Sequence, residues 1–80
     1  MKARVYVSPK TTVLDPQGQA IQAALQGLGH AAIHDVRQGK FFEVELTGAN
    51  REAAASEMDQ IAREVLSNPV IEDYRVEFFD

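Results

Sequence analysis

The sequence lacks several features that would narrow its function at once. Its 80 residues include no cysteine, so disulfides and cysteine-ligated zinc sites are excluded. No stretch approaches the roughly 18 consecutive apolar residues of a membrane helix, and no apolar signal segment is evident. Eight basic residues face 12 acidic ones, and the net charge of -4 argues against nucleic-acid binding by phosphate neutralisation. We therefore expect one cytoplasmic domain over residues 1–80.

The sequence also lacks a recognisable catalytic arrangement. It has no serine, histidine and carboxylate set at a typical spacing, and no glycine-rich phosphate loop ending in lysine. His30 and His34 are four residues apart, but we expect one after a helix and the other in a strand, where it would pair with Glu43. Glu43 and Glu45 share a strand face, which fits a solvated or interfacial surface better than acid–base catalysis. We expect no catalytic, cofactor-binding or metal-binding residue.

Residues 33–46 predict a β-hairpin. Two short runs flank Gln38 and Gly39, where a tight turn would use the positive φ that glycine tolerates. In that register Arg37 faces Lys40, and like charges placed directly opposite each other destabilise a two-stranded ribbon. The tip is either an exposed, solvated hairpin end or a site that meets an acidic partner or an anion.

Residues 16–28 predict a helix without any charged residue. Asp15 can cap it, Pro16 suits its first position, and Gly29 follows its end. Apolar residues at helical spacing make the expected buried stripe: Ile21, Ala24, Leu25 and Leu28. A second line holds small residues: Gly18, Ala20, Ala23 and Gly27. The uncharged face is either a mild, glutamine-rich solvent face or a surface built for close contact with another protein.

Two further strands and a second helix complete the pattern. The strands are expected over residues 2–7 and 74–79, and the helix over residues 50–66. The core stripe of this helix is expected to be Ala54, Met58, Ile61, Ala62 and Val65. The order is that of the α+β, ferredoxin-like βαββαβ fold. Right-handed crossovers would place both helices on one face of a four-stranded antiparallel sheet.

The other face of that sheet would carry no helix. It is expected to present an apolar set among charged residues: Tyr6, Val36, Phe41 and Phe79. Full burial of one such side chain is worth about 1.5–3 kcal/mol. We therefore expect self-association through this face or through the sheet edges.

Four segments in series resemble the PurS family. They are VLDPQGQAI, the LG that closes the first helix, DVRQGK followed by FFEVEL, and SNPVIEDYRVE. PurS proteins are the small subunit of phosphoribosylformylglycinamidine synthase in purine biosynthesis. The resemblance runs from Val5 to Glu77, with a looser match at residues 10–12 and in the second helix.

The resemblance implies an accessory subunit of an ATP-dependent amidoligase, without a catalytic site of its own. It implies a homodimer or homotetramer that bridges a glutaminase subunit and a large synthetase subunit and supports ammonia transfer between them. ATP and Mg would belong to the large subunit, and neither nucleic acid nor membrane is implied. We expect the uncharged helix and the hairpin tip to dock the partners, through Gly18, Ala20, Ala23, Gly27, Arg37, Gly39 and Lys40.

Other functions are compatible with this fold. A dimeric ACT-like module that binds a small regulatory molecule would also lack catalytic residues, and an amino acid alone would stabilise it. An RNA-binding module needs aromatic residues on a basic sheet face, which the acidic balance opposes. An acylphosphatase needs an anion-binding loop after the first strand, and Ser8, Pro9 and Lys10 offer little toward one.

Overall fold

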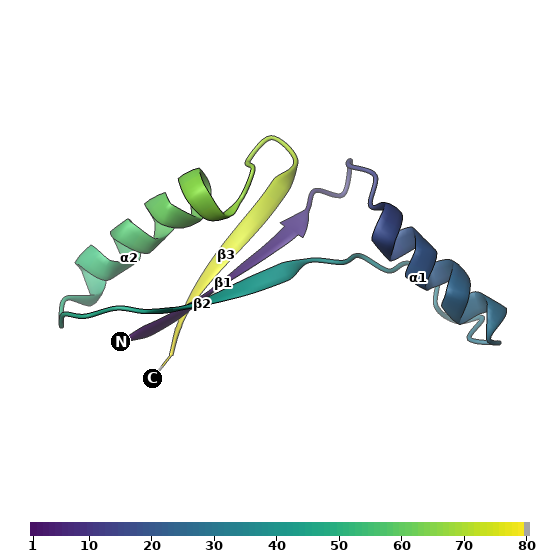
Figure 1. The fold of residues 1–80 in the computed structure, drawn as a ribbon, viewed down its shortest axis with the longest axis horizontal. Helices are drawn as coiled ribbons and strands as arrows, with labels where there is room; N and C mark the ends of the chain where they lie inside the picture. Colours follow the sequence, from purple (N-terminus) through teal and green to yellow (C-terminus); the bar gives the residue numbers. More distant parts are fainter. Residues whose placement is uncertain (80) are drawn as a thin grey trace.

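The structure, a computed structural model, describes residues 1–79. Its elements are β1 (Lys2–Pro9), α1 (Pro16–Gly27), β2 (Lys40–Glu45), α2 (Arg51–Ile61), a π-helical turn η1 (Ala62–Leu66) and β3 (Glu72–Phe79). The strands form one antiparallel sheet in the order β2-β1-β3, with α2 across one face (Figure 1). Neither helix of the described chain is long and apolar enough to cross a membrane.

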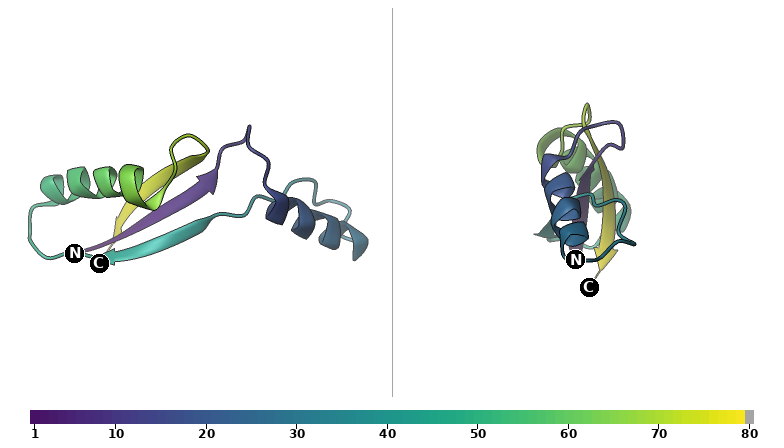
Figure 2. Two further views of the ribbon diagram at one scale, coloured as in Figure 1. Left: turned by 45° about the horizontal axis from the view of Figure 1, so that its top comes forward. Right: turned by 90° about the vertical axis from the view of Figure 1, so that its right-hand side faces the viewer.

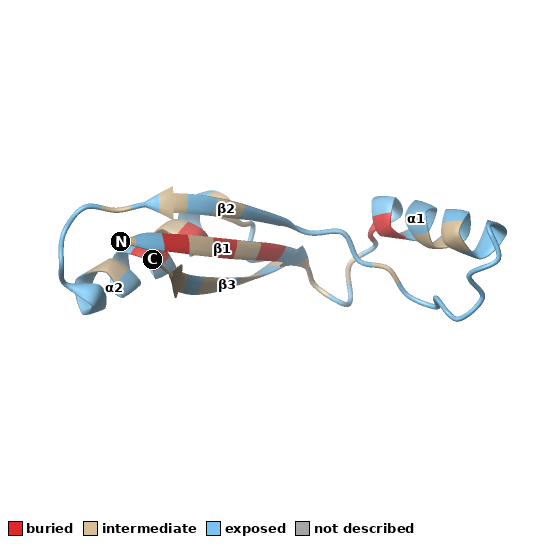
Figure 3. Ribbon diagram, turned by 90° about the horizontal axis from the view of Figure 1, so that it is seen from below, coloured by how far each residue is buried: buried red, intermediate tan, exposed pale blue. Residues whose placement is uncertain are grey.

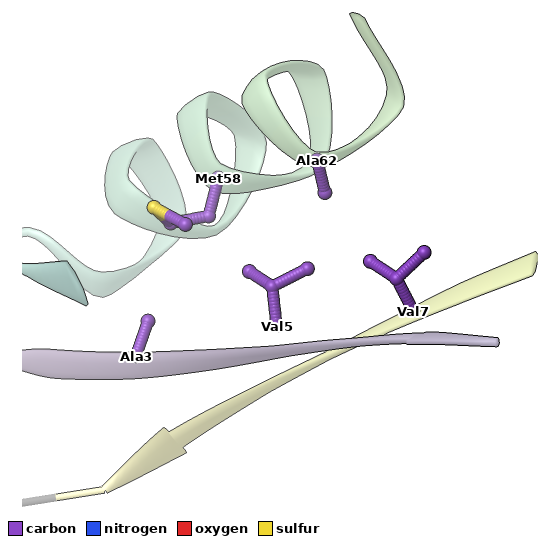
Figure 4. Packing of buried hydrophobic residues seen from close by; sticks show 5 residues of the cluster. All are labelled: Ala3, Val5, Val7, Met58 and Ala62. Atoms are coloured by element: carbon purple, nitrogen blue, oxygen red, sulfur yellow. The ribbon is translucent and has the colours of Figure 1, made fainter. Parts of the chain in front are cut away.

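The hydrophobic core lies between β1 and α2. Alternate side chains of β1 point to one face of the sheet and meet the helix there. The fully enclosed members are Ala3, Val5, Val7, Met58 and Ala62 (Figure 4). The expected inward face of the last strand is confirmed, because its alternate residues pack against this cluster: Tyr74, Val76 and Phe78. The period of two in residues 2–7 and 74–79 therefore predicted both strands and their core faces.

The hairpin prediction is wrong, and the part of the chain that the structure describes has three strands instead of four. Residues 33–37 form no strand, and Gly39 does not adopt a positive φ. The strand β2 pairs with β1, so that Lys40 lies opposite Val7 and not opposite Arg37.

Three backbone groups of residues 33–38 have their partners on α1 or on its capping residue Asp15 instead of on a strand. The carbonyls of Ile33 and His34 accept hydrogen bonds from glutamine side chains of α1, and the N–H of Gln38 donates to the carboxylate of Asp15. Because these polar groups are already satisfied, no β-ladder is needed to compensate for the loss of water.

The helix α1 does not cover the sheet, in contrast to the prediction that both helices share one face. It lies beyond the sheet and the chain returns along it, and we call residues 15–38 the arm (Figures 1 and 2). The arm makes the molecule long and thin, with extents of 50 × 27 × 14 Å.

The expected buried stripe of α1 is also wrong. Ile21 is 41% exposed and Leu28 is 77% exposed, Ala24 is exposed, and only Leu25 of the stripe is half-buried. Figure 3 shows most of α1 in the colour of exposed residues. Helical periodicity identifies an apolar face but not the surface that covers it. The helix itself is secured locally, by the Asp15 cap and by Pro16 in its first turn.

The second helix begins at its expected cap, since the side chain of Asn50 accepts a hydrogen bond from the N–H of Ala53. Its last turn is the π-helical η1, which holds one residue more than an α-helical turn. The added residue shifts the inward position from Val65, which is 74% exposed, to Leu66, which packs against the core. The prediction of Val65 as a core residue is therefore wrong.

Candidate functional site: the bare sheet face and the arm

The sheet face opposite α2 is a mixed surface of arginine and aromatic rings. Arg4 lies near its middle, with Nη2 3.1 Å from Glu43 Oε2. Its guanidinium carbon lies 4.6 Å from the ring centre of Phe79 and 5.3 Å from that of Phe41. The ring centres of Tyr6 and Phe41 are 6.0 Å apart. Phe41 remains 56% exposed, so the chain itself does not cover this face.

Two arginines of this face are engaged with neighbouring side chains. A hydrogen bond to the Tyr6 hydroxyl, followed by the one to Glu43, raises the pKa of Arg4 above its ordinary value. Arg75 Nη1 lies 2.9 Å from Glu77 Oε2, and the Arg75 guanidinium lies 4.3 Å from the Tyr6 ring centre. A second surface could therefore cover the face without leaving these two arginines unpaired, which is the costly outcome of burying a charge.

Three of the four residues predicted for self-association lie on this face: Tyr6, Phe41 and Phe79. Val36 does not, because residues 33–37 are not part of the sheet. It lies in the returning segment of the arm, where its carbonyl is close to Gly18. The prediction that Val36 belongs to the bare sheet face is therefore wrong.

Glutamine side chains tie the two halves of the arm together. Their hydrogen bonds are 2.7–2.9 Å long and join Gln26 to the carbonyl of Ile33, Gln22 to the carbonyl of His34, and Gln38 to the side chain of Gln17. These bonds give the uncharged, glutamine-rich composition of α1 a role inside the chain. A neutral amide donates to a backbone carbonyl without the desolvation cost of a charged group.

Asp15 joins the start of α1 to the end of the returning segment. Its side chain is 7% exposed; Oδ1 accepts from the N–H of Gly18 at 3.1 Å and Oδ2 from the N–H of Gln38 at 2.7 Å. The Gln38 bond first, and then the Gly18 bond, hold the pKa of Asp15 below its ordinary value. The positive charge of Arg37 acts in the same direction. We call Asp15, Gly18, Arg37 and Gln38 the clasp.

Two of the glycines predicted to dock a partner lie against the chain itself. A Cβ at Gly18 would overlap the carbonyl oxygen of Val36. A Cβ at Gly39 would lie 2.6 Å from the carbonyl oxygen of Val7, at the end of β1. The close approach that small residues allow is real at both positions, but the backbone that approaches is the protein's own.

The two basic residues of the expected hairpin tip are separated. Arg37 donates from Nη2 to the carbonyls of Lys10, at 2.6 Å, and Val13, at 3.1 Å. Lys40 lies in β2 with Nζ 4.0 Å from Glu72 Oε2. The predicted repulsion between Arg37 and Lys40 is therefore absent, and Arg37 links the arm to the loop that precedes it.

The remaining surface of α1 is uncharged and open. Ala20 and Ala23 are exposed, and a Cβ at Gly27 would meet nothing within 4 Å. Ile21 and Leu28 add exposed apolar area on the same helix or at its end. Of the predicted docking positions, Ala20, Ala23, Gly27 and Lys40 therefore stay accessible to another protein.

Metal-ligating side chains do not gather into a site in the part of the chain that the structure describes. No group of three or more histidine, aspartate or glutamate side chains in residues 1–79 could hold a metal ion. The hairpin had predicted that Glu43 pairs with His34. In the structure Glu43 pairs with Arg4 instead. His34 lies instead in the arm, with Nδ1 3.4 Å from the carbonyl of Ala32.

Comparison with known proteins decides the family. The family model PurS, described as phosphoribosylformylglycinamidine (FGAM) synthase, matches residues 2–80. The chain belongs to the PurS family. Among its relatives, the phosphoribosylformylglycinamidine synthase subunit PurS of Mycobacterium leprae is 48% identical over 75 residues, which are 94% of this chain and 91% of the relative. The PurS subunit of Bacillus subtilis is 42% identical over 76 residues, or 95% of this chain and 89% of the relative.

Solved structures of the PurS family share the fold. Bacillus subtilis PurS superimposes with a TM-score of 0.82 at 42% identity, covering 95% of this chain and 94% of that chain. A chain in the structure of PurLQS from Thermotoga maritima gives a TM-score of 0.85 at 30% identity, covering 95% and 93%. The resemblance found in the four sequence segments is confirmed over nearly the whole chain.

Sequence reasoning did not identify the clasp or the glutamine bonds of this PurS-family chain. Asp15 was assigned only the role of a helix cap, which is half of what its carboxylate does. A glycine three residues after a capping aspartate, together with glutamines on a helix that lacks charge, was the available signal. The partners of these side chains could not be inferred, because they lie 7 to 23 residues away along the chain, in a segment that was predicted to be part of a β-hairpin.

Proposed function

We propose that the chain is the small, non-catalytic subunit of phosphoribosylformylglycinamidine synthase in purine biosynthesis. The observation that supports this most is the nearly full-length match to PurS subunits, together with the likeness to a chain of the PurLQS structure from Thermotoga maritima. In this proposal the chain bridges a glutaminase subunit and a large ATP-dependent synthetase subunit, in the cytoplasm, and supports transfer of ammonia between them.

The form of the molecule supports a bridging role. It is 50 Å long and 14 Å thick, and it presents an open arm surface at one end and a bare sheet face at the other (Figures 1 and 3). One small subunit of this shape can contact two larger proteins at separate places. ATP and Mg are proposed to bind in the large subunit, where the ligase chemistry would take place.

Docking is proposed to use the part of α1 that the returning segment leaves free. Ala20, Ala23 and Gly27 let another backbone come close, and Lys40 adds a half-exposed positive charge at the start of β2. Self-association is proposed to use the aromatic residues of the bare sheet face and to give a dimer or a dimer of dimers. Arg4 would be covered in that assembly together with its partners Glu43 and Tyr6.

The docking proposal is tested by mixing the chain with the glutaminase and synthetase subunits and following assembly by size-exclusion chromatography. Ala23→Arg should weaken assembly because it places a long charged side chain in a close contact, and Lys40→Glu should weaken it by reversing the charge. Arg63→Glu in η1 is the matched control, since Arg63 is exposed and its ion pairs are with Asp59 and Glu64 of the same helical segment. Normal assembly by both test variants would contradict the proposed docking surface.

A further inference from the structure

The connection between the arm and the sheet is narrow. The chain leaves β1 through residues 10–14 and returns through Gln38 and Gly39 into β2. The helix α1 does not pack on the sheet or on α2 (Figure 1). Two covalent links alone would form a hinge, about which the arm could rotate. Within a single chain, the contacts that fix the direction of the arm therefore lie at this junction.

Asp15 ties the outgoing and returning chains together at the junction. It precedes α1 on the outgoing side, and its Oδ2 accepts the N–H of Gln38, immediately before Gly39, at 2.7 Å. Its other oxygen accepts the N–H of Gly18 in the first turn of α1, at 3.1 Å. The same carboxylate therefore fixes where the helix begins and where the returning chain meets it. Its exposure of 7% leaves little access for water to replace either bond.

Further bonds continue from the clasp to the sheet. Arg37 donates to the carbonyls of Lys10 and Val13, which belong to the outgoing loop. Lys10 in turn donates its N–H to the carbonyl of Ile71 at 2.9 Å, and its Nζ lies 2.8 Å from Asp73 Oδ1 in β3. The absence of a side chain at Gly39 lets the returning chain pass against β1. The arm is thus linked to both β1 and β3 through consecutive contacts.

We propose that Asp15 is a positioning residue that locks the arm in one direction relative to the sheet, and that this fixed direction lets one subunit engage the glutaminase and the synthetase together. The inference rests on the proposed bridging function and adds a residue and a mechanism to it. A loose arm would still present its docking surface, but the two catalytic subunits would no longer be held in one relative orientation.

Asp15→Asn separates this role from helix capping. Asparagine is as good an N-cap as aspartate, so α1 should still begin at the same residue. An amide, however, has only one acceptor oxygen, so its NH₂ would face the N–H of Gln38, donor against donor. Asp35→Asn is the matched control, because Asp35 is an exposed aspartate of the same arm that makes no side-chain hydrogen bond within residues 1–79.

Hydrogen exchange on the full chain tests the lock itself. In Asp15→Asn we expect the amides of residues 16–38 to exchange at least about tenfold faster, because a charge-assisted bond is lost, while amides of β1 and α2 keep their protection. Asp35→Asn should match the parent throughout. Unchanged exchange in the arm of Asp15→Asn would overturn the proposal.

Synthesis by the reconstituted complex tests whether the fixed direction of the arm is needed for the bridging function. With Asp15→Asn at saturating concentration, glutamine-dependent synthesis should fall at least about tenfold, while synthesis supplied with free ammonia stays at the level of the parent complex. Rapid exchange in the arm with full glutamine-dependent synthesis would overturn the positioning role. If the parent chain itself supported no glutamine-dependent synthesis, the proposed function would fail, and the exchange result would still decide whether Asp15 locks the arm.

Discussion

At the scale of single residues, the absence of a side chain matters most where the protein's own backbone passes. Gly18 stands in the first turn of a helix, where glycine costs up to about 1 kcal/mol relative to alanine. The structure explains why glycine is present in spite of this cost, because a Cβ at this position would overlap the carbonyl oxygen of Val36. Gly27, at the other end of the same helix, has open space instead.

These two glycines should respond in opposite directions to the same substitution. Gly18→Ala should loosen the arm, because the returning segment must move away from the new methyl group. Gly27→Ala should stabilise the helix by up to about 1 kcal/mol through its better helical propensity. Hydrogen exchange of the α1 amides measures both effects, and equal changes in the two variants would contradict the close approach at Gly18.

Acid should release the clasp. Because hydrogen bonds from Gln38 and Gly18 lower the pKa of Asp15, its carboxylate stabilises the folded arm above the ordinary pKa of 3.8, and this stabilisation is lost as the pH falls through the lower, folded-state pKa. The amide signals of Gly18 and Gln38 should therefore move on acidification below about pH 4. In Asp15→Asn this transition should be missing. A transition that persists in the variant would assign it to another group.

At the scale of elements, the end of the second helix shows how one added residue redirects side chains. The π-helical η1 turns Leu66 inward and leaves Val65 outside. A regular α-helical period through residues 51–66 places Val65 on the core side instead, which is why the sequence pattern predicted Val65 as a core residue. The bond from Ser67 Oγ to the carbonyl of Ala62, 2.7 Å long, closes this wide turn.

A pair of alanine substitutions tests that register. Val65→Ala should change the free energy of unfolding by less than about 0.5 kcal/mol, as exposed substitutions do. Leu66→Ala should cost more, although less than the about 2–5 kcal/mol of a fully buried leucine, because Leu66 is only half-buried. Urea denaturation measures both values. A larger cost at Val65 than at Leu66 would restore the α-helical register.

The elements differ in how well their surroundings could be predicted from the sequence. Residues 2–7 and 74–79 alternate strictly, and such a pattern leaves one face for the core, so both strands were predicted with their orientation. The caps of both helices were predicted because a cap acts within four residues. The surroundings of α1 were not predicted, since its glutamines bond to a segment that has strand-like composition but no strand partner.

At the scale of the whole molecule, the fold leaves two surfaces without cover. The prediction of a bare sheet face was based on four strands, yet it holds for three of its four residues, because β1, β2 and β3 keep their alternation. The arm was not predicted, since a helix of this length normally packs on its own sheet. Exposed apolar groups on both surfaces indicate that the chain works in an assembly.

Self-association through the sheet face can be tested at its most exposed aromatic residue. Phe41→Lys should shift the oligomer toward monomer in sedimentation at micromolar concentration, because a charge would replace apolar contact area next to Arg4. Val70→Lys is the control: Val70 is 79% exposed and lies in the turn before β3, outside the sheet. A parent chain that sediments as a monomer, or equal behaviour of both variants, would contradict an interface on this face.

The most direct measurement of the central claim is the rate of glutamine-dependent FGAM formation by the glutaminase and synthetase subunits, with and without this chain. We predict that added chain raises this rate strongly while the chain alone turns over neither glutamine nor ATP. The ammonia-dependent rate should change far less, because free ammonia does not need to be passed between two aligned active sites. A glutamine-dependent rate that is the same with and without the chain would contradict its role as the bridging subunit.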